Sequence, residues 1–359
     1  MSLSCDLFCR VVDNFGDAAV CWRLAKQLVG EHGWQVRLWI DDIGPLSLLR
    51  PGFDPGRPSQ TLDGVEVFRW PTPFPDVSPR QVVIEAFACE LPEPFVNAMA
   101  TQPRQPVWLN LEYLSAEPWI VGCHRLPSPH PRLPLIKHFF FPGFVAGSGG
   151  LIRERDLAAS ALRPDDTPLR ISLFCYENTA LAQLLDVWRD GERAILCRVA
   201  DGAPRRQAEK WFGQALAIGQ SVGRGKLQLE ALPFLAQADY DALLRDCHVN
   251  FVRGEDSFVR AQWAEQPFIW QAYPQEASVH LDKLAAFLSL YARPLSPQAG
   301  DAVVAFWRAW NGQGDVADTW HPFLAHLNDL TGHGNWWAKE IGRHGDLAEN
   351  LVRFCRDRI

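Results

Sequence analysis

The sequence predicts an α/β protein built from two unequal, doubly wound domains, and three observations support this class. Short apolar segments alternate with segments whose apolar residues recur at helical spacing, which is typical of βαβ units around a parallel sheet. The 359 residues are more than one ordinary core covers and fit two domains. A stretch rich in proline and glycine, residues 127–150, divides the alternating pattern into two halves.

The first half opens with an apolar segment, residues 7–12, that predicts a buried strand of the parallel type. An acidic turn with one glycine, residues 13–17, follows it. After the turn, Val20, Leu24 and Leu28 stand at a spacing of four and predict a helix. Further strands are predicted at residues 36–40, 65–68, 82–87 and 107–111.

The second half repeats the alternation. Strands are predicted at residues 171–176, 194–199, 226–232, 249–252 and 267–270, and helices at residues 179–188, 206–218, 238–245, 257–265, 278–291, 301–310 and 347–358. We therefore expect an N-terminal domain of residues 1–155 and a C-terminal domain of residues 156–359, facing a central cleft. The C-terminal helices could return to pack on the N-terminal domain.

Charge and composition exclude several classes of protein. The net charge of −7 argues against a general nucleic-acid binder, which needs clustered cations. The 47% hydrophobic and 21% charged content is that of a soluble globular protein. The longest apolar runs fall short of the ~20 residues that span a bilayer, so we expect no membrane segment. The first residues lack a basic region and an apolar signal core, so we expect a cytoplasmic protein.

The cysteines and histidines predict no metal site. The nine cysteines are scattered, form no CxxC pair, and have no zinc-finger spacing with histidine. We expect reduced and mostly buried thiols, as in other cytoplasmic proteins.

A turn in the second half joins a strand to a helix and carries several polar side chains. The strand at residues 249–252 runs into Arg253, Gly254, Glu255, Asp256 and Ser257. In an open α/β sheet, ligands bind at the carboxyl ends of the strands. A glycine there lets the backbone approach a ligand, and the N–H groups of the new helix suit a phosphate. The alternative is that Asp256 or Ser257 only caps the helix.

The acidic turn in the first half is the second candidate. Gly16 would allow a tight turn, and Asp17 would stand at the start of the helix, where the helix dipole keeps a carboxylate ionised. Such a carboxylate accepts a proton or holds a cation. The alternative is a helix cap for Asp17 and an Asx-turn for Asp13. Neither a G-x-G-x-x-G fingerprint nor a P-loop occurs, which disfavours an ordinary dinucleotide site and triphosphate hydrolysis.

Read together, the two turns resemble a known family. Residues 6–17 with 21–25, and residues 251–257 with Trp263 and 267–275, are similar to the bacterial EF-P arginine rhamnosyltransferases, EarP. The resemblance extends along nearly the whole chain. It implies a GT-B-like fold of two Rossmann-like domains and a metal-independent, inverting transfer. L-rhamnose would pass from dTDP-β-L-rhamnose, with no further cofactor, to an arginine side chain of translation elongation factor P.

The resemblance also implies roles for individual residues. The N-terminal domain would face elongation factor P and the C-terminal domain would bind the donor. Asp13, Asp17 and Glu255 would be catalytic, with their division of labour left open. Phe234 and Gln237 are candidates for the thymine, and the Tyr176 hydroxyl for a phosphate or ribose. The full set of candidate substrate-binding residues is Asn14, Phe15, Gly16, Phe174, Tyr176, Phe234, Gln237, Arg253, Gly254, Asp256, Ser257 and Gln271.

Three alternatives stand beside this hypothesis. Another GT-B transferase would use a different sugar nucleotide or acceptor. A non-catalytic, nucleotide-binding regulator of translation would bind elongation factor P without adding a sugar. A Rossmann oxidoreductase is disfavoured by the missing glycine fingerprint.

Overall fold

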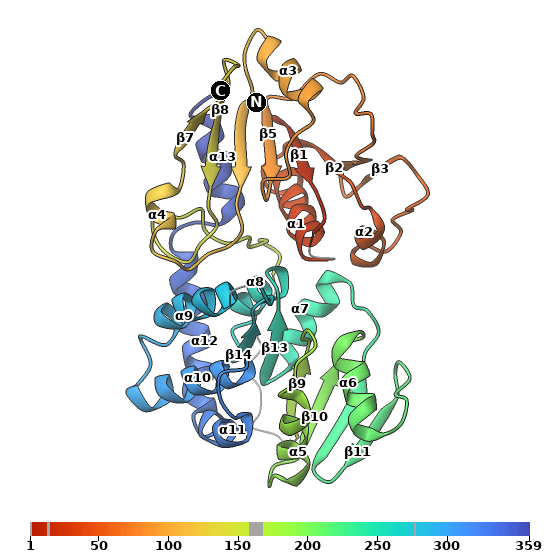
Figure 1. The fold of residues 1–359 in the computed structure, drawn as a ribbon, viewed down its shortest axis with the longest axis vertical. Helices are drawn as coiled ribbons and strands as arrows, with labels where there is room; N and C mark the ends of the chain where they lie inside the picture. The colour runs from red at the N-terminus through yellow and green to blue at the C-terminus, as the bar shows by residue number, and fades with distance from the viewer. Residues whose placement is uncertain (1, 13–14, 158–167, 276–277) are drawn as a thin grey trace. The chain divides into compact units, whose positions relative to one another are not determined.

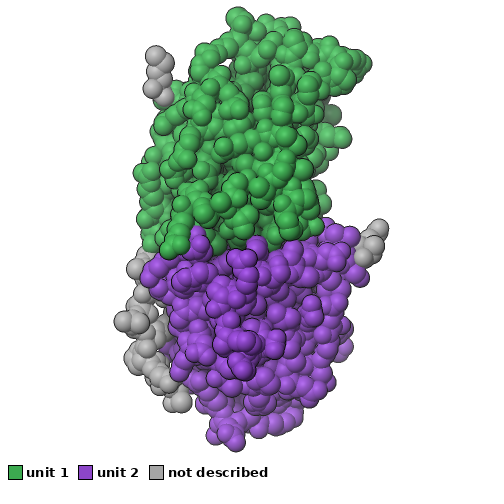
Figure 2. All heavy atoms as spheres, turned by 90° about the vertical axis from the view of Figure 1, so that its left-hand side faces the viewer, with its two compact units in different colours: residues 1–157, 341–359 green, residues 158–340 purple. Residues whose placement is uncertain are grey.

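The structure is a computed structural model that describes residues 2–12, 15–157, 168–275 and 278–359. The chain forms two compact units, coloured separately in Figure 2. Unit 1 comprises Met1–Leu157 and Ile341–Ile359, and unit 2 comprises Ala158–Glu340. Residues 341–359, which the prediction assigned to the C-terminal domain with helices that could return to the N-terminal domain, belong to unit 1.

Unit 1 is organised around an eight-stranded sheet with the order β3-β4-β2-β1-β5-β6-β8-β7 (Figure 1). Its outermost strands, β3 and β7, pair antiparallel and the other pairs are parallel. The strands are β1 (Ser4–Cys9), β2 (Gln35–Ile40), β3 (Ser59–Leu62), β4 (Val65–Arg69), β5 (Val82–Ala86), β6 (Val107–Leu111), β7 (Pro127–Pro129) and β8 (Ile136–Phe140). The helices are α1 (Gly16–Gly30), α2 (Gly44–Leu49), α3 (Glu93–Thr101), α4 (Ile120–Cys123) and α13 (Leu347–Arg356).

The last helix, α13, explains why the C-terminal residues belong to unit 1. Its apolar face, including Leu351 and Phe354, is buried in the same core as β1, β2 and α1. The Phe354 ring also lies edge-on to Phe140 of β8, with ring centres 5.9 Å apart. The N–H of Leu347 donates to the carbonyl of Leu151, 2.9 Å away, which fixes the start of the helix. Burial of this apolar face is the main force that returns the chain to unit 1.

Unit 2 has a six-stranded sheet with the order β11-β12-β10-β9-β13-β14, antiparallel only between β11 and β12. Its strands are β9 (Leu169–Leu173), β10 (Ile195–Val199), β11 (Ser221–Arg224), β12 (Leu227–Ala231), β13 (Val249–Arg253) and β14 (Phe268–Gln271). Its helices are α5 (Leu181–Asp190), α6 (Ala203–Phe212), α7 (Gln237–Asp246), α8 (Asp256–Trp263), α9 (Val279–Tyr291), α10 (Pro297–Trp310), α11 (Val316–Ala325) and α12 (Leu327–Gly342). Stacked aromatic rings, among them Phe287 on Trp307, fill the space between β14 and the helices α9 and α10.

Several predicted elements end earlier than expected, each for a local reason. β1 ends at Cys9 because the N–H of Val11 donates to a carboxylate oxygen of Asp41, 2.9 Å away, instead of continuing the sheet. α6 ends at Phe212, where Gly213 takes a left-handed conformation. Strands β3, β7, β8 and β11 and helices α2, α3, α4, α11 and α12 were not predicted.

The cysteines are free thiols, and all but Cys123 are buried. Burial raises the pKa of the Cys175 thiol to about 12. Among the residues that the structure describes, no helix combines the length and the apolar character needed to cross a bilayer.

Candidate active site

The first group of candidate residues lies in unit 2, at the carboxyl ends of β9, β13 and β14, which are neighbours in the sheet. Arg253 is the last residue of β13, and Phe174 and Tyr176 follow β9. The guanidinium carbon of Arg253 lies 4.4 Å from the ring centre of Phe174 and 4.4 Å from that of Tyr176. Both contacts are cation–π interactions, so the two rings orient this cation at the sheet edge.

Gln271, the last residue of β14, holds this arrangement together. It is opposite Arg253 in the parallel register, and its side-chain oxygen accepts the N–H of Tyr176 at 2.8 Å. Its carbonyl accepts the N–H of Gly254 at 3.4 Å. The indole N–H of Trp270 donates to the carbonyl of Gly254, 2.8 Å away. Gly254 has a φ of 61°, a conformation that glycine adopts without strain.

Ser257 closes the turn between β13 and α8. Its hydroxyl accepts the N–H of Arg253 at 3.0 Å and donates to the carbonyl of the same residue at 2.5 Å. The Ser257 side chain therefore fixes the backbone of the turn. α8 begins at Asp256, and the backbone N–H groups of its first turn are directed toward the N-terminal end of the helix. These groups are the part of the turn suited to an anion.

Asp256 takes part in a buried ion-pair network within unit 2. Its carboxylate accepts the Nε–H of Arg260 at 2.9 Å, and Nη1 of Arg260 reaches both oxygens of Asp241 at 2.9 and 2.8 Å. Only 2% of the Arg260 side chain is exposed. At least one oxygen of Asp256 thus stabilises the fold through Arg260, a role that neither the donor-binding prediction nor the helix-capping alternative included.

The remaining candidates of unit 2 flank these turns. Glu255 is the residue before α8, and its side chain makes no capping hydrogen bond to that helix. Phe234 is exposed in the segment between β12 and α7. Gln237 is the first residue of α7, and its Nε2 atom is buried without a hydrogen-bond partner among the described residues. A buried amide donor that lacks an acceptor in the protein is suited to a polar ligand atom.

The second group lies in unit 1, at the start of α1. Asp17 is 2% exposed, and one of its carboxylate oxygens accepts the N–H of Val12 at 2.8 Å. Gly16 is the first helical residue, so it begins α1 instead of forming the turn before it. Phe15 directly precedes the helix. Asp13 and Asn14 lie outside the described residues. The Asp17 carboxylate therefore sits at the positive end of the helix and tethers the preceding loop.

Two buried polar side chains at the same sheet edge were missed by the sequence analysis. Glu85 of β5 accepts the N–H of Glu90 at 3.1 Å, and Asn110 of β6 accepts the N–H of Ala88 at 3.0 Å. Each is a single polar residue in an otherwise apolar strand, and that interruption is the signal that could have identified them.

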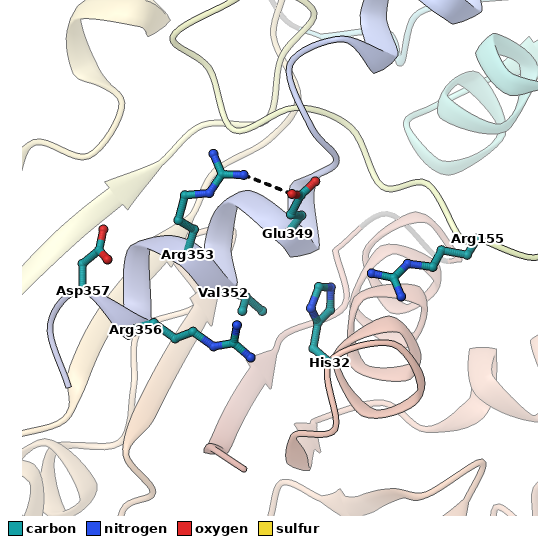
Figure 3. A pocket seen from close by; sticks show the side chains of 7 residues that line it. All are labelled: His32, Arg155, Glu349, Val352, Arg353, Arg356 and Asp357. Atoms are coloured by element: carbon teal, nitrogen blue, oxygen red, sulfur yellow. Dashed lines mark hydrogen bonds and ion pairs between the residues drawn. The ribbon is translucent and has the colours of Figure 1, made fainter. Parts of the chain in front are cut away.

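A pocket of about 320 Å³ lies elsewhere in unit 1 and involves none of the predicted residues. Figure 3 shows the Arg356 side chain of α13 extending toward His32, which follows α1. Its other arginines already have carboxylate partners, Arg353 with Glu349 at 3.0 Å and Arg155 with Glu31. The charge in this pocket is thus nearly balanced. Within the described part of the chain, no three His, Cys, Asp or Glu side chains gather as metal ligands would.

The protein has two largely parallel sheets, each flanked by helices, with candidate residues at the carboxyl edge of each sheet. This architecture is that of the GT-B class of glycosyltransferases. The solved glycosyltransferase of kitacinnamycin has this fold, with a TM-score of 0.56 at 9% identity over 100% of this chain and 99% of that chain. The family model described as Elongation-Factor P (EF-P) rhamnosyltransferase EarP matches residues 5–356. The chain belongs to the EarP family.

Two individual proteins of the family are similar over their whole length. The protein-arginine rhamnosyltransferase of Pseudomonas putida is 44% identical over 378 aligned residues, which cover 100% of both chains. A solved structure that describes EarP-mediated arginine glycosylation of translation elongation factor EF-P is 31% identical, with a TM-score of 0.68 and 100% coverage of both chains. The family resemblance predicted from the two turns is therefore confirmed.

Proposed function

We propose that this chain is a protein-arginine rhamnosyltransferase that moves L-rhamnose from dTDP-β-L-rhamnose to an arginine side chain of elongation factor P, with inversion at the anomeric carbon. The observation that carries the proposal is the match of residues 5–356 to the EarP family, because it spans both candidate sites. The names of the P. putida relative and of the solved EarP structure support the arginine acceptor and elongation factor P.

Unit 2 is proposed to bind the donor. Arg253 supplies a fixed cation, and the first turn of α8 supplies backbone N–H groups, so the two together favour a pyrophosphate. The exposed ring of Phe234 offers a flat surface for the thymine, and the unpartnered amide of Gln237 offers a donor for a base oxygen. Tyr176 remains a candidate for the ribose or a phosphate, and Glu255 for the sugar hydroxyls or the acceptor.

Unit 1 is proposed to bind and activate the acceptor. A guanidinium has a pKa above ~12 and no free lone pair, so it is a poor nucleophile until a proton leaves. The Asp17 carboxylate would hold the guanidinium and accept that proton as a nitrogen attacks the anomeric carbon. The new C–N bond forms while the C–O bond to the diphosphate breaks, and the electron pair of that bond leaves with dTDP. Asp13 is proposed to share in positioning or proton transfer.

Stabilisation of the departing diphosphate is the second requirement of this reaction. Negative charge grows on the diphosphate oxygen as the C–O bond breaks, and fixed donors aimed at that oxygen lower the barrier. The Arg253 guanidinium and the N–H groups of α8 would meet this need, since both are held by the sheet. Because these groups meet the need, we propose that the reaction requires neither a metal ion nor a cofactor. We also propose that it takes place in the cytoplasm.

Mass spectrometry of elongation factor P tests the proposal. The purified chain is incubated with elongation factor P and dTDP-β-L-rhamnose, with and without EDTA, and we expect the mass of one deoxyhexose on a single arginine in both cases. Acceptor with lysine in place of that arginine is the matched control and should gain no mass. Transfer from UDP- or GDP-sugars instead would favour another GT-B transferase. Binding of elongation factor P with no added sugar from any donor would favour the non-catalytic regulator.

A further inference from the structure

The turn after β5 has an unusual backbone. Phe87, Ala88 and Glu90 have φ values of 56°, 51° and 55°, in the left-handed region that side chains other than glycine rarely adopt. Each such residue costs about 1–2 kcal/mol. A chain keeps this conformation only where its surroundings enforce it, and strain of this kind concentrates at functional sites.

Two buried side chains of the sheet enforce the turn. Asn110 accepts the N–H of Ala88 at 3.0 Å, and Glu85 accepts the N–H of Glu90 at 3.1 Å. Both side chains are almost inaccessible to solvent. Their hydrogen bonds to a strained turn are stabilised by burial, since an unpaired polar group in the sheet would be costly.

The enforced turn orients an aromatic ring. Phe87 stacks on Tyr113, which follows β6, with ring centres 4.3 Å apart and an angle of 14° between the planes. Tyr113 is 40% exposed, so the pair borders solvent. Glu112 directly follows β6, and its carboxylate accepts a hydrogen bond from the Asn110 amide. Asn110 thus holds both the strained turn and the Glu112 carboxylate.

This aromatic and acidic group shares a sheet edge with the Asp17 loop. In the parallel register, Phe8 of β1 is opposite Glu85 of β5, and Glu85 is opposite Asn110 of β6. The residues that follow these three positions therefore emerge side by side at the carboxyl edge of unit 1. The loop that Asp17 tethers begins at this edge, directly after β1.

We propose that Glu112 and the Phe87–Tyr113 pair complete the acceptor-binding subsite: the Glu112 carboxylate binds N–H groups of the acceptor guanidinium other than those that Asp17 holds, and the aromatic pair covers the face of the guanidinium. This inference rests on the proposed function. A planar guanidinium matches a carboxylate through paired N–H donors and stacks on aromatic rings, whereas an ammonium does neither as well. The neighbouring Glu85 carboxylate is paired with Lys137 at 3.1 Å, which leaves Glu112 as the acid of the subsite.

Steady-state kinetics of Glu112→Gln and Tyr113→Leu test the subsite. The Gln variant keeps an oxygen for the Asn110 amide and removes the charge. We expect its KM for elongation factor P to rise about 10-fold or more. Tyr113→Leu should raise the same KM about 3-fold. In both variants the affinity for dTDP, measured by calorimetry, should stay at the wild-type value, a split that general misfolding would not produce.

Glu66→Gln is the matched control, because it removes a half-buried carboxylate of β4 that lies outside the subsite and should leave KM unchanged. If the wild-type enzyme is active and the Glu112→Gln variant has the wild-type KM for elongation factor P, the subsite is overturned and the proposed function still stands. A wild-type enzyme that transfers no sugar to elongation factor P overturns the proposed function itself. A KM increase as large in Glu66→Gln as in Glu112→Gln also overturns the subsite.

Discussion

Replacing Arg260 by methionine should destabilise the protein strongly. In the native structure its guanidinium lies between Asp241 and Asp256, with N–O distances of 2.8 and 2.9 Å. The exposed fractions of the three side chains are 2%, 12% and 14%. Methionine keeps most of the apolar volume but leaves two poorly solvated carboxylates without their cation. Breaking a buried pair in this way costs about 3–5 kcal/mol of unfolding free energy.

Arg205→Met is the matched control for this prediction. Arg205 also lies between two carboxylates, Asp201 and Glu209, each at 2.8 Å, but 25% of its side chain is exposed. Solvent screens such pairs, so the control should lose no more than about 1 kcal/mol. The two variants therefore differ mainly in the burial of the arginine.

Urea unfolding of the full chain, followed by tryptophan fluorescence and circular dichroism, provides the measurement. Two probes are needed because a chain of two units can unfold in more than one step. A loss in Arg260→Met no larger than that in Arg205→Met would refute the reasoning that burial makes this network important. Calorimetry with dTDP should also show weaker binding, because the network fixes Asp256 at the start of α8.

Three further changes test other parts of the structure. Asp17→Asn should lower turnover about 100-fold or more with unchanged dTDP affinity, and wild-type turnover would refute its role as base. Burial lowers the pKa of His333 to about 4. The unfolded chain, with a histidine pKa of about 6.5, therefore binds more protons below that pH, and stability falls as the pH drops from about 6.5 to 4. His333→Gln should flatten this fall in urea titrations at several pH values; an unchanged slope would contradict it. Gly150→Ala would place a Cβ 2.6 Å from the carbonyl oxygen of Gly345, whereas Gly33→Ala, also at positive φ, meets open space. The melting temperature should therefore fall further in Gly150→Ala, and equal falls would exclude the steric explanation.

The fold class was predictable because parallel strands are buried on both faces. β6 is buried along its whole length and was predicted with the bounds that the structure has, since its apolar run cannot be exposed on either side. The return of α13 to unit 1 was not fixed by any local pattern. An amphipathic helix shows that it needs a partner surface, but its sequence does not say which one.

The residues of the candidate donor site were predictable from the sequence, but their arrangement in space was not. Phe174, Tyr176 and Arg253 were each singled out, yet the contact of Arg253 with both rings depends on the register of β9 and β13, which the sequence does not state. Asp256 illustrates a different difficulty. Asp256 stands four residues before Arg260, so an ion pair between them could be inferred from the sequence. The second carboxylate that binds Arg260 belongs to Asp241 on another helix, and the sequence does not indicate that contact.

In each unit, polar side chains of the strands hold the backbone of one segment at the carboxyl edge. The Gln271 side chain holds Tyr176 after β9, and the Asn110 and Glu85 side chains hold the turn after β5. A buried amide or carboxylate in a strand must find a partner, and the nearest unpaired groups are those of the turns where the ladder ends. A site anchored this way takes its precision from the sheet, not from the turn sequence. A lone polar residue in a buried strand is therefore a better guide to such a site than the short motif in the turn that follows it.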